Sequence, residues 1–212
     1  MQICDSFELF EFLKVEKGYL KELRDPLWWP NSGKFEVVVG AILTQQTKWQ
    51  KVEKALMNLK QNALLKLEAL AICDTKLLAT LIKPSGFYNT KAKRLKLLAN
   101  NILRDFGSFE VFQNEVSREW LLSQKGLGKE SSDSILCYAC KREVLPVDSY
   151  TVRVVKKFGY EFEEYDELKE WCESGVLSNL EKIWKIYNEE KPLYEIFARF
   201  HGKIVEYAKE EL

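Results

Sequence analysis

Residues 124–133 read QKGLGKESSD, with glycines at positions 126 and 128 and a lysine on either side of them. The stretches on either side of these glycines, REWLLSQ (118–124) and ESSDSILCYAC (130–140), carry apolar residues at helical spacing. Glycine accepts the positive φ of a tight turn and leaves backbone N–H groups exposed where the second helix begins. The pattern predicts helix, turn and helix. The turn could hold a phosphate, or its glycines could serve only the turn.

Charged and hydroxyl side chains surround this turn. Lys125 and Lys129 add positive charge, and Ser131 adds a hydroxyl donor. Groups of these kinds make the sequence-independent backbone contacts of DNA complexes. Lys91 lies in the most basic helix start of the chain, within residues 85–103, which is either a second phosphate-binding face or a solvated surface.

The rest of the chain is typical of an all-α protein. Apolar residues recur at three- and four-residue spacing, and alternating β-type runs are nearly absent. Short turn signals separate the helical runs, so we expect about ten helices. Residues 35–43 (FEVVVGAIL) are apolar almost throughout, so we expect a central helix there, with a buried strand as the alternative.

The amino-acid composition indicates a folded protein but does not indicate a binding partner. The 212 residues are 46% hydrophobic and 30% charged, which is ordinary for a folded protein, and 32 basic residues balance 32 acidic ones. A polyanion-binding surface therefore requires segregated charge. The first residues lack a secretion signal and no apolar run is long enough to span a membrane, so we expect a cytoplasmic protein.

The five cysteines are scattered, which favours reduced thiols. Cys137 and Cys140 form a CxxC whose spacing puts both on one helical face. We interpret the pair as packing residues, because no second CxxC or nearby histidine completes a four-ligand metal set.

A carboxylate follows the glycine turn. In residues 143–159 (EVLPVDSYTVRVVKKFG), Pro146 stiffens a turn and Asp148 stands just before a predicted helix. Asp148 is a candidate catalytic residue, and the alternative is that it only caps the helix.

The order of these features resembles the helix-hairpin-helix, Gly/Pro-Asp superfamily of base-excision DNA glycosylases, which contains endonuclease III. Residues 42–52 (ILTQQTKWQKV) are similar to the family's glutamine-bearing helix end, and residues 84–99 (PSGFYNTKAKRLKLLA) to its Gly-x-Tyr-x-x-Lys-Ala segment. The resemblance implies two helical domains with Asp148 at the cleft between them. One is a barrel of residues 34–147 that carries the hairpin motif at about 117–140; the other combines residues 1–33 and 148–212.

Two departures from endonuclease III bear on the chemistry. Where that enzyme has a nucleophilic lysine, this chain has Glu130, and a carboxylate cannot form a Schiff base. Lys129 is one residue away, roughly 100° around the helix. No cysteine follows Cys172, so the iron–sulfur cluster of endonuclease III cannot be built, and we expect no cofactor and no metal.

Tryptophans make the third departure. Trp28 and Trp29 lie between Pro26 and Pro30, and Trp49 follows the glutamines of residues 45–46. Each could simply cover a core, but together they suit a base pocket. With the missing lysine and cluster, they resemble the bacterial 3-methyladenine DNA glycosylase III branch of the superfamily.

The resemblance implies a role for each candidate residue. Asp148 is the catalytic carboxylate, and Gln45 fills the gap left by a flipped nucleotide. The expected base pocket consists of Trp28, Trp29, Trp49, Glu130 and Lys203. The expected DNA-contacting residues are Gln45, Lys91, Lys125, Gly126, Gly128, Lys129 and Ser131. His201 more often caps or packs than catalyses at such a position, and Glu130 could be a solvated helix residue.

These features predict a monofunctional DNA glycosylase that flips out alkylated purines, 3-methyladenine above all, and hydrolyses their N-glycosidic bond. Its partner is double-stranded DNA with damaged bases, no membrane is involved, and we expect a monomer associated with the nucleoid. Two alternatives stay open. One is an endonuclease III-like glycosylase and lyase for oxidised pyrimidines, with another lysine as nucleophile; the other is a non-enzymatic DNA-binding module.

Overall fold

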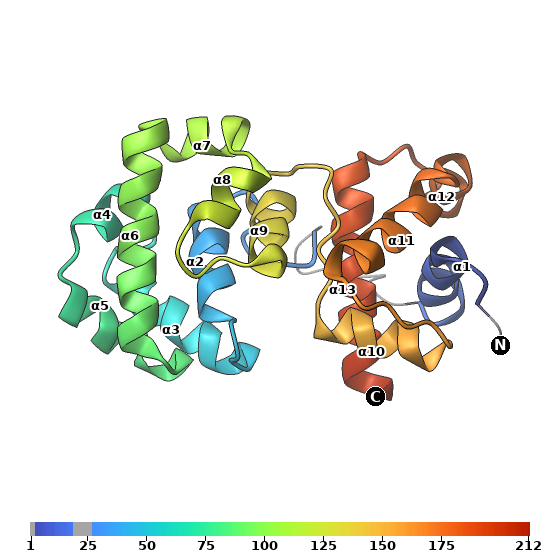
Figure 1. The fold of residues 1–212 in the computed structure, drawn as a ribbon, viewed down its shortest axis with the longest axis horizontal. Helices are drawn as coiled ribbons and strands as arrows, with labels where there is room; N and C mark the ends of the chain where they lie inside the picture. The colour runs from blue at the N-terminus through green and yellow to red at the C-terminus, as the bar shows by residue number, and fades with distance from the viewer. Residues whose placement is uncertain (1–2, 19–26) are drawn as a thin grey trace. The chain divides into compact units, whose positions relative to one another are not determined.

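The computed structural model describes residues 3–18 and 27–212, and within them the chain is helical and contains no strand (Figure 1). The all-α prediction is therefore confirmed. The chain divides into two compact units: unit 1 comprises Met1–Ser32 and Lys141–Leu212, and unit 2 comprises Gly33–Cys140. No helix of the described residues is both long and apolar enough to cross a membrane.

Unit 2 is built around a buried helix. Its elements are α2 (Phe35–Leu43), α3 (Trp49–Gln61), α4 (Leu67–Ile72), α5 (Thr75–Leu81), η2 (Lys83–Ser85), α6 (Tyr88–Phe106), α7 (Phe109–Glu115), α8 (Arg118–Ser123), α9 (Lys129–Ser134) and the π-helical turn η3 (Ile135–Ala139). Every residue of α2 except Glu36 is buried, so the segment is the central helix that we expected and not a strand.

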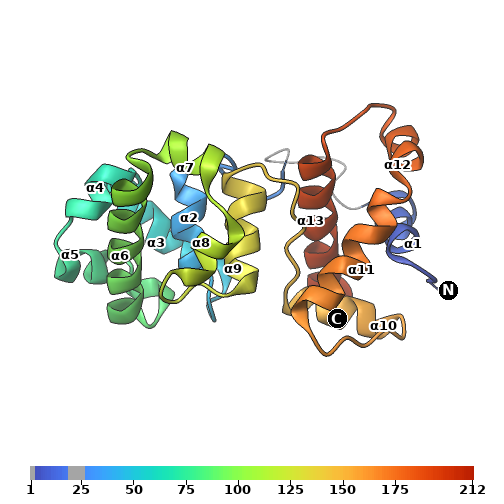
Figure 2. The same ribbon diagram turned by 45° about the horizontal axis from the view of Figure 1, so that its top comes forward.

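The longest helix of unit 2, α6, is amphipathic. Leu95, Leu98 and Ile102 are buried on one face, and α4 and α5 pack along the helix (Figure 2). Side-chain caps fix where the shorter helices begin: Asp74 caps α5, Ser108 caps α7 and Ser117 caps α8. The last of these helices, α8, leads into the glycine hairpin before α9.

Unit 1 joins the two ends of the chain. Its elements are α1 (Ser6–Glu11), η1 (Phe12–Glu16), α10 (Ser149–Lys157), α11 (Tyr165–Leu177), α12 (Leu180–Tyr187) and α13 (Leu193–Glu211). α1 packs against α11, and α10 against α13 (Figure 2). Gly175 allows α1 to approach closely, because a Cβ there would collide with the Ser6 hydroxyl and the backbone N of Phe7. Phe10 and Phe200 meet edge to face in the shared core, with ring centroids 5.5 Å apart.

The linker after the hairpin lies in unit 1. We expected the barrel to run to residue 147, but residues 141–147 belong to unit 1 because Leu145 and Val147 pack in its core. The expected helix over residues 130–140 is also not continuous, since α9 changes into the π-helical turn η3. Cys137 and Cys140 are buried there, as expected of packing residues. Among residues 3–18 and 27–212, no cluster of metal-ligating side chains exists.

Candidate functional site

The glycine hairpin forms as predicted, and its first glycine is needed for two reasons. Gly126 has a φ of +89°, a backbone conformation that residues with a Cβ rarely adopt. A Cβ at Gly126 would also collide with the Arg94 side chain, which lies directly against it. Leu127 is buried and its N–H donates to the Gln124 carbonyl at 3.1 Å, so it anchors the turn.

The second half of the hairpin faces open space. Gly128 is the N-cap of α9 and supplies no side chain to its first turn, and nothing lies within 4 Å of a Cβ built on it. Lys125, Gly128 and Glu130 are exposed and Lys129 is half-buried. An anion approaching this end of α9 would therefore meet backbone N–H groups with two lysines nearby.

Gln45 is bound to the hairpin. Its Nε2 donates to the Gly126 carbonyl at 2.9 Å and to the Ser131 hydroxyl at 3.1 Å. Arg94 Nη1 donates in turn to Gln45 Oε1 at 3.3 Å. The structure thus brings Gln45, Gly126 and Ser131 together, three of the residues that we expected to contact DNA. For Gln45 to fill the gap left by a flipped nucleotide, these hydrogen bonds must break.

Lys91 does not have the role that we expected. Its side chain is buried, and Nζ lies 2.8 to 2.9 Å from four acceptors, the carbonyls of Leu43, Gln45 and Ser85 and the hydroxyl of Thr47. Burial lowers its pKa to about 8, and the charge of Arg94 acts in the same direction. An ammonium with three hydrogens and four acceptors cannot also reach a phosphate, so Lys91 fixes the loop that carries Gln45 instead.

In unit 1, Asp148 caps α10 with one oxygen. Oδ1 accepts hydrogen bonds from Thr151 N at 2.9 Å and Thr151 Oγ1 at 3.1 Å, while Asp148 N donates back to Thr151 Oγ1 at 3.2 Å. The capping alternative is therefore correct as local structure. The helix cap does not involve the second carboxylate oxygen, Oδ2, which lies 3.5 Å from His201 Nε2 on α13.

The surroundings of Asp148 keep it ionised. Burial by itself would raise the pKa of this carboxyl, whose side chain is 15% exposed. The His201 imidazole, whose Nε2 lies 3.5 Å from Oδ2, and the two Thr151 donors outweigh burial and hold the pKa of Asp148 below its ordinary value of 3.8. A carboxylate with this environment can stabilise a cation that develops beside it.

Trp28 lies beside the same histidine. It has a φ of +74°, and its ring meets His201 edge-on, with centroids 5.4 Å apart and planes at 87°. Its Nε1 donates to Glu206 Oε1 at 3.0 Å, and the Lys209 ammonium lies 5.6 Å from the ring centroid. Trp28 is half-buried, whereas Trp29 is 8% exposed and packs in the interior. Pro26 lies outside the described residues.

Sequence reasoning missed Lys209. Its Nζ also lies 3.1 Å from Glu206 Oε1, the oxygen that binds Trp28. The i, i+3 spacing of Glu206 and Lys209 on a predicted helix was the available signal. Structure was needed to place Trp28 against that pair.

Lys203 also departs from expectation. It is fully buried in unit 1, where Nζ donates to Tyr187 Oη at 2.8 Å and to the Arg199 carbonyl at 3.3 Å and lies 5.0 Å from the Phe10 ring centroid. Burial, with Lys14 and Arg199 adding to it, lowers its pKa well below the ordinary value. In this structure Lys203 is therefore a core residue of unit 1, which does not match the place in a base pocket that we expected for it.

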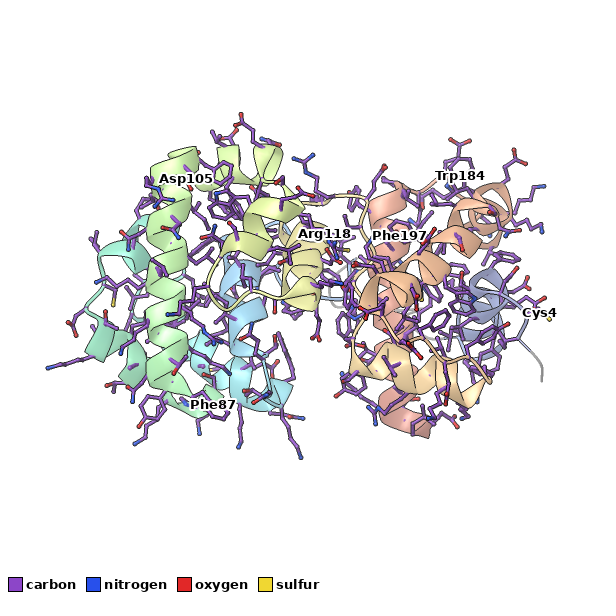
Figure 3. The ribbon with its side chains drawn as sticks, in the orientation of Figure 1. Cys4, Phe87, Asp105, Arg118, Trp184 and Phe197 are labelled. Atoms are coloured by element: carbon purple, nitrogen blue, oxygen red, sulfur yellow. The ribbon has the colours of Figure 1, made fainter. Side chains whose placement is uncertain are left out.

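The remaining candidates lie in unit 2. Trp49 begins α3 and is half-buried, and Glu130 is exposed in the first turn of α9. A further residue that the sequence did not single out is Phe87, which is 69% exposed with a φ of +44° just before α6 (Figure 3). An exposed aromatic ring on a left-handed backbone is unusual, so Phe87 is a further candidate contact residue.

The comparisons with known proteins identify the family of this chain. Residues 39–176 match the family described as HhH-GPD superfamily base excision DNA repair protein. The chain belongs to this superfamily. The resemblance drawn from the hairpin and the aspartate loop is thereby confirmed, and the coarse function follows with it: the protein is a DNA glycosylase of this superfamily.

Several similar proteins match over nearly the whole chain. "Putative DNA repair glycosylase MJ1434" of Methanocaldococcus jannaschii is 43% identical over 208 residues, covering 94% of this chain and 88% of the relative. The crystal structure of H. pylori 3-methyladenine DNA glycosylase (MagIII) bound to 1,N6-ethenoadenine is 50% identical, with a TM-score of 0.94 over 98% of this chain and 99% of that one. A non-covalent endonuclease III–DNA complex shares the fold, at 18% identity and a TM-score of 0.67 over 97% of this chain and 86% of that chain.

Proposed function

We propose that this protein is a monofunctional glycosylase that removes alkylated purines, 3-methyladenine above all, from double-stranded DNA. The observation that carries the proposal is the arrangement in unit 1, where an ionised Asp148 and the ring of Trp28 both contact His201. The likeness to H. pylori MagIII over the whole chain supports the choice of substrate. Glu130, in place of a nucleophilic lysine, supports hydrolysis without strand cleavage.

The aromatic ring explains a preference for cationic bases. Methylation at N3 gives adenine a positive charge and makes it a good leaving group. The enzyme therefore has to bind the flipped base but does not have to protonate it. Trp28 already has a cation, the Lys209 ammonium, near its ring. A flipped cationic base that took this position would gain about 0.5–2 kcal/mol from the ring, depending on how far it is desolvated.

Asp148 acts on the sugar. As the bond between C1′ and the base lengthens, positive charge grows on the sugar ring, and a fixed carboxylate stabilises it. A water molecule then bonds to C1′ as the base leaves with the bonding electrons, and the water gives up a proton. Because the departing 3-methyladenine is neutral once the bond has broken, no general acid is required.

The hairpin holds the DNA backbone. The exposed end of α9, with Gly126 and Gly128 in the turn and Lys125 and Lys129 beside it, contacts a phosphate. Phe87 is placed to wedge between bases, a known way to open a stack for flipping.

Replacement of Asp148 by asparagine tests the proposed function. Asp148→Asn should lower the single-turnover release of 3-methyladenine from methylated duplex about 100-fold or more, as expected when a fixed charge is removed from the developing cation. Asp74→Asn is the matched control, because Asp74 caps α5 as Asp148 caps α10 and lies in the other unit. The proposal is wrong if Asp148→Asn keeps near wild-type release.

Two further assays separate the alternatives. Oxidised-pyrimidine duplexes run beside methylated ones should give no release, and borohydride should trap no covalent protein–DNA adduct. A trapped adduct would refute the monofunctional mechanism, and the absence of alkali-labile sites on every duplex would indicate a binding module.

A further inference from the structure

The two oxygens of Asp148 are held by different helices. Oδ1 accepts from Thr151, within α10, and Oδ2 lies 3.5 Å from His201 Nε2, on α13. A capping carboxylate held only at Oδ1 could still rotate about the bond to its Cβ, because Asp side chains have a broad final torsion. His201 Nε2 on α13, 3.5 Å from Oδ2, lies where it restricts that rotation.

His201 is itself tightly held. Its side chain is 5% exposed, and the Trp28 ring packs edge-on against the imidazole. It lies near the middle of a helix of 19 residues, in which most neighbouring residues are buried and which packs on α10. The imidazole is therefore a rigid spacer between the carboxylate and the indole.

The opposite side of Trp28 is also fixed. Its Nε1 donates to Glu206, which pairs with Lys209. His201, Glu206 and Lys209 all belong to α13, so one helix sets the position of the aromatic ring and of the carboxylate together. Two groups that act on the same nucleotide, one on the base and one on the sugar, are thus placed by a single rigid element.

We propose that His201 is a positioning residue that fixes the plane of the Asp148 carboxylate against Trp28, so that the carboxylate meets the sugar cation in the productive orientation. The inference rests on the proposed function and goes beyond it by assigning a role to a residue that neither touches the base nor transfers a proton. Such a residue affects the transition state and leaves DNA binding unchanged.

Two substitutions separate the ring of His201 from its nitrogen. His201→Phe keeps a ring against Trp28 and loses the contact with Oδ2, while His201→Gln keeps an Nε2 donor and loses the ring. The Phe variant should lower the single-turnover rate constant roughly 10- to 100-fold, the scale of a small misplacement of a catalytic group. The Gln variant should stay within about threefold of wild type, since the contact to Asp148 remains. For both, the DNA concentration at half-saturation should change less than about twofold.

Ile204→Ala is the control for a general loosening of α13, because Ile204 is a buried core residue one turn after His201. It should lower the melting temperature and leave the rate constant near wild type. In the Asp148→Asn background, His201→Phe should cause no further loss of rate, because the group it positions is gone.

Each outcome decides one question. A slow Phe variant with an active Gln variant supports the inference. A Phe variant at the wild-type rate, a Gln variant as slow as Phe, or an equal loss in Ile204→Ala overturns it while the proposed function stands. If the wild-type protein releases no alkylated base, the proposed function fails and the inference fails with it.

Discussion

Replacing Lys91 by methionine should reveal how strongly the Gln45 loop depends on one buried charge. Methionine keeps the length and apolar stem of lysine but removes the ammonium, which lies within 2.9 Å of four acceptors from two separate stretches of chain. Three of those acceptors, on Leu43, Gln45 and Thr47, lie at the end of α2 and in the loop that follows it.

The expected cost follows from the hydrogen bonds that are lost. Three ammonium hydrogens can make three bonds, and a hydrogen bond to a charged group contributes about 1.5–3 kcal/mol. Burying the charge opposes folding, as the lowered pKa of about 8 shows, so the net contribution is smaller than the sum of the three. We expect Lys91→Met to lower the free energy of unfolding by about 2–4 kcal/mol.

Urea unfolding of the full chain at pH 7, followed by circular dichroism, measures this loss. Lys93→Met is the control, because Lys93 lies on the same helix and is exposed; it should change stability by less than about 0.5 kcal/mol. The loop should also loosen, so Lys91→Met should weaken DNA binding even at temperatures where the protein remains folded. Equal, small losses in both variants would refute the reasoning.

Three further predictions concern the hairpin, the exposed ring and Asp148. Gly126→Ala should cost about 1–3 kcal/mol in a urea titration and weaken DNA binding, while Gly128→Ala should cost less than about 1 kcal/mol, because only Gly126 has a positive φ and a neighbour in the way. Phe87→Ala should slow base release about tenfold with little change in melting temperature, since the ring is 69% exposed; an unchanged rate in stopped-flow base flipping would remove it from the mechanism. The rate of base release should not fall between pH 8 and pH 5 through protonation of Asp148. A carboxyl with a pKa below 3.8 stays ionised over this range and loses its charge only as the pH falls through its pKa. A fall in rate near pH 6 that disappears in Asp148→Asn would contradict this prediction.

The sequence predicted those features that depend on neighbours along the chain. Helical periodicity, the turn at Gly126 and the helix start at Asp148 each follow from a few consecutive residues, and the structure contains all three. The burial of Lys91 and Lys203 could not be predicted in this way, because their acceptors come from residues up to 48 positions away. A lysine is assigned to the surface by default, and only tertiary structure shows which one has enough partners to be buried.

The same limit applied to His201. Nothing near it in the sequence shows that α13 returns to the N-terminus of α10, and the contact with Asp148 joins residues 53 positions apart, as the numbering shows. Along the chain, Trp28 is even farther from His201 than Asp148 is. Candidate chemistry could be recognised from residue types, but the arrangement of carboxylate, imidazole and indole could not.

Because unit 1 combines residues from both parts of the chain, it cannot be completed until late in translation. During translation, Trp28, the hairpin and Asp148 all leave the ribosome before α13 does. Until the residues of α13 emerge, Asp148 has only its own helix as a partner and the Trp28 ring has neither His201 nor Glu206 beside it. A nascent or prematurely terminated chain would thus carry the glycine hairpin without an organised carboxylate, and we expect base excision to begin only once α13 has docked.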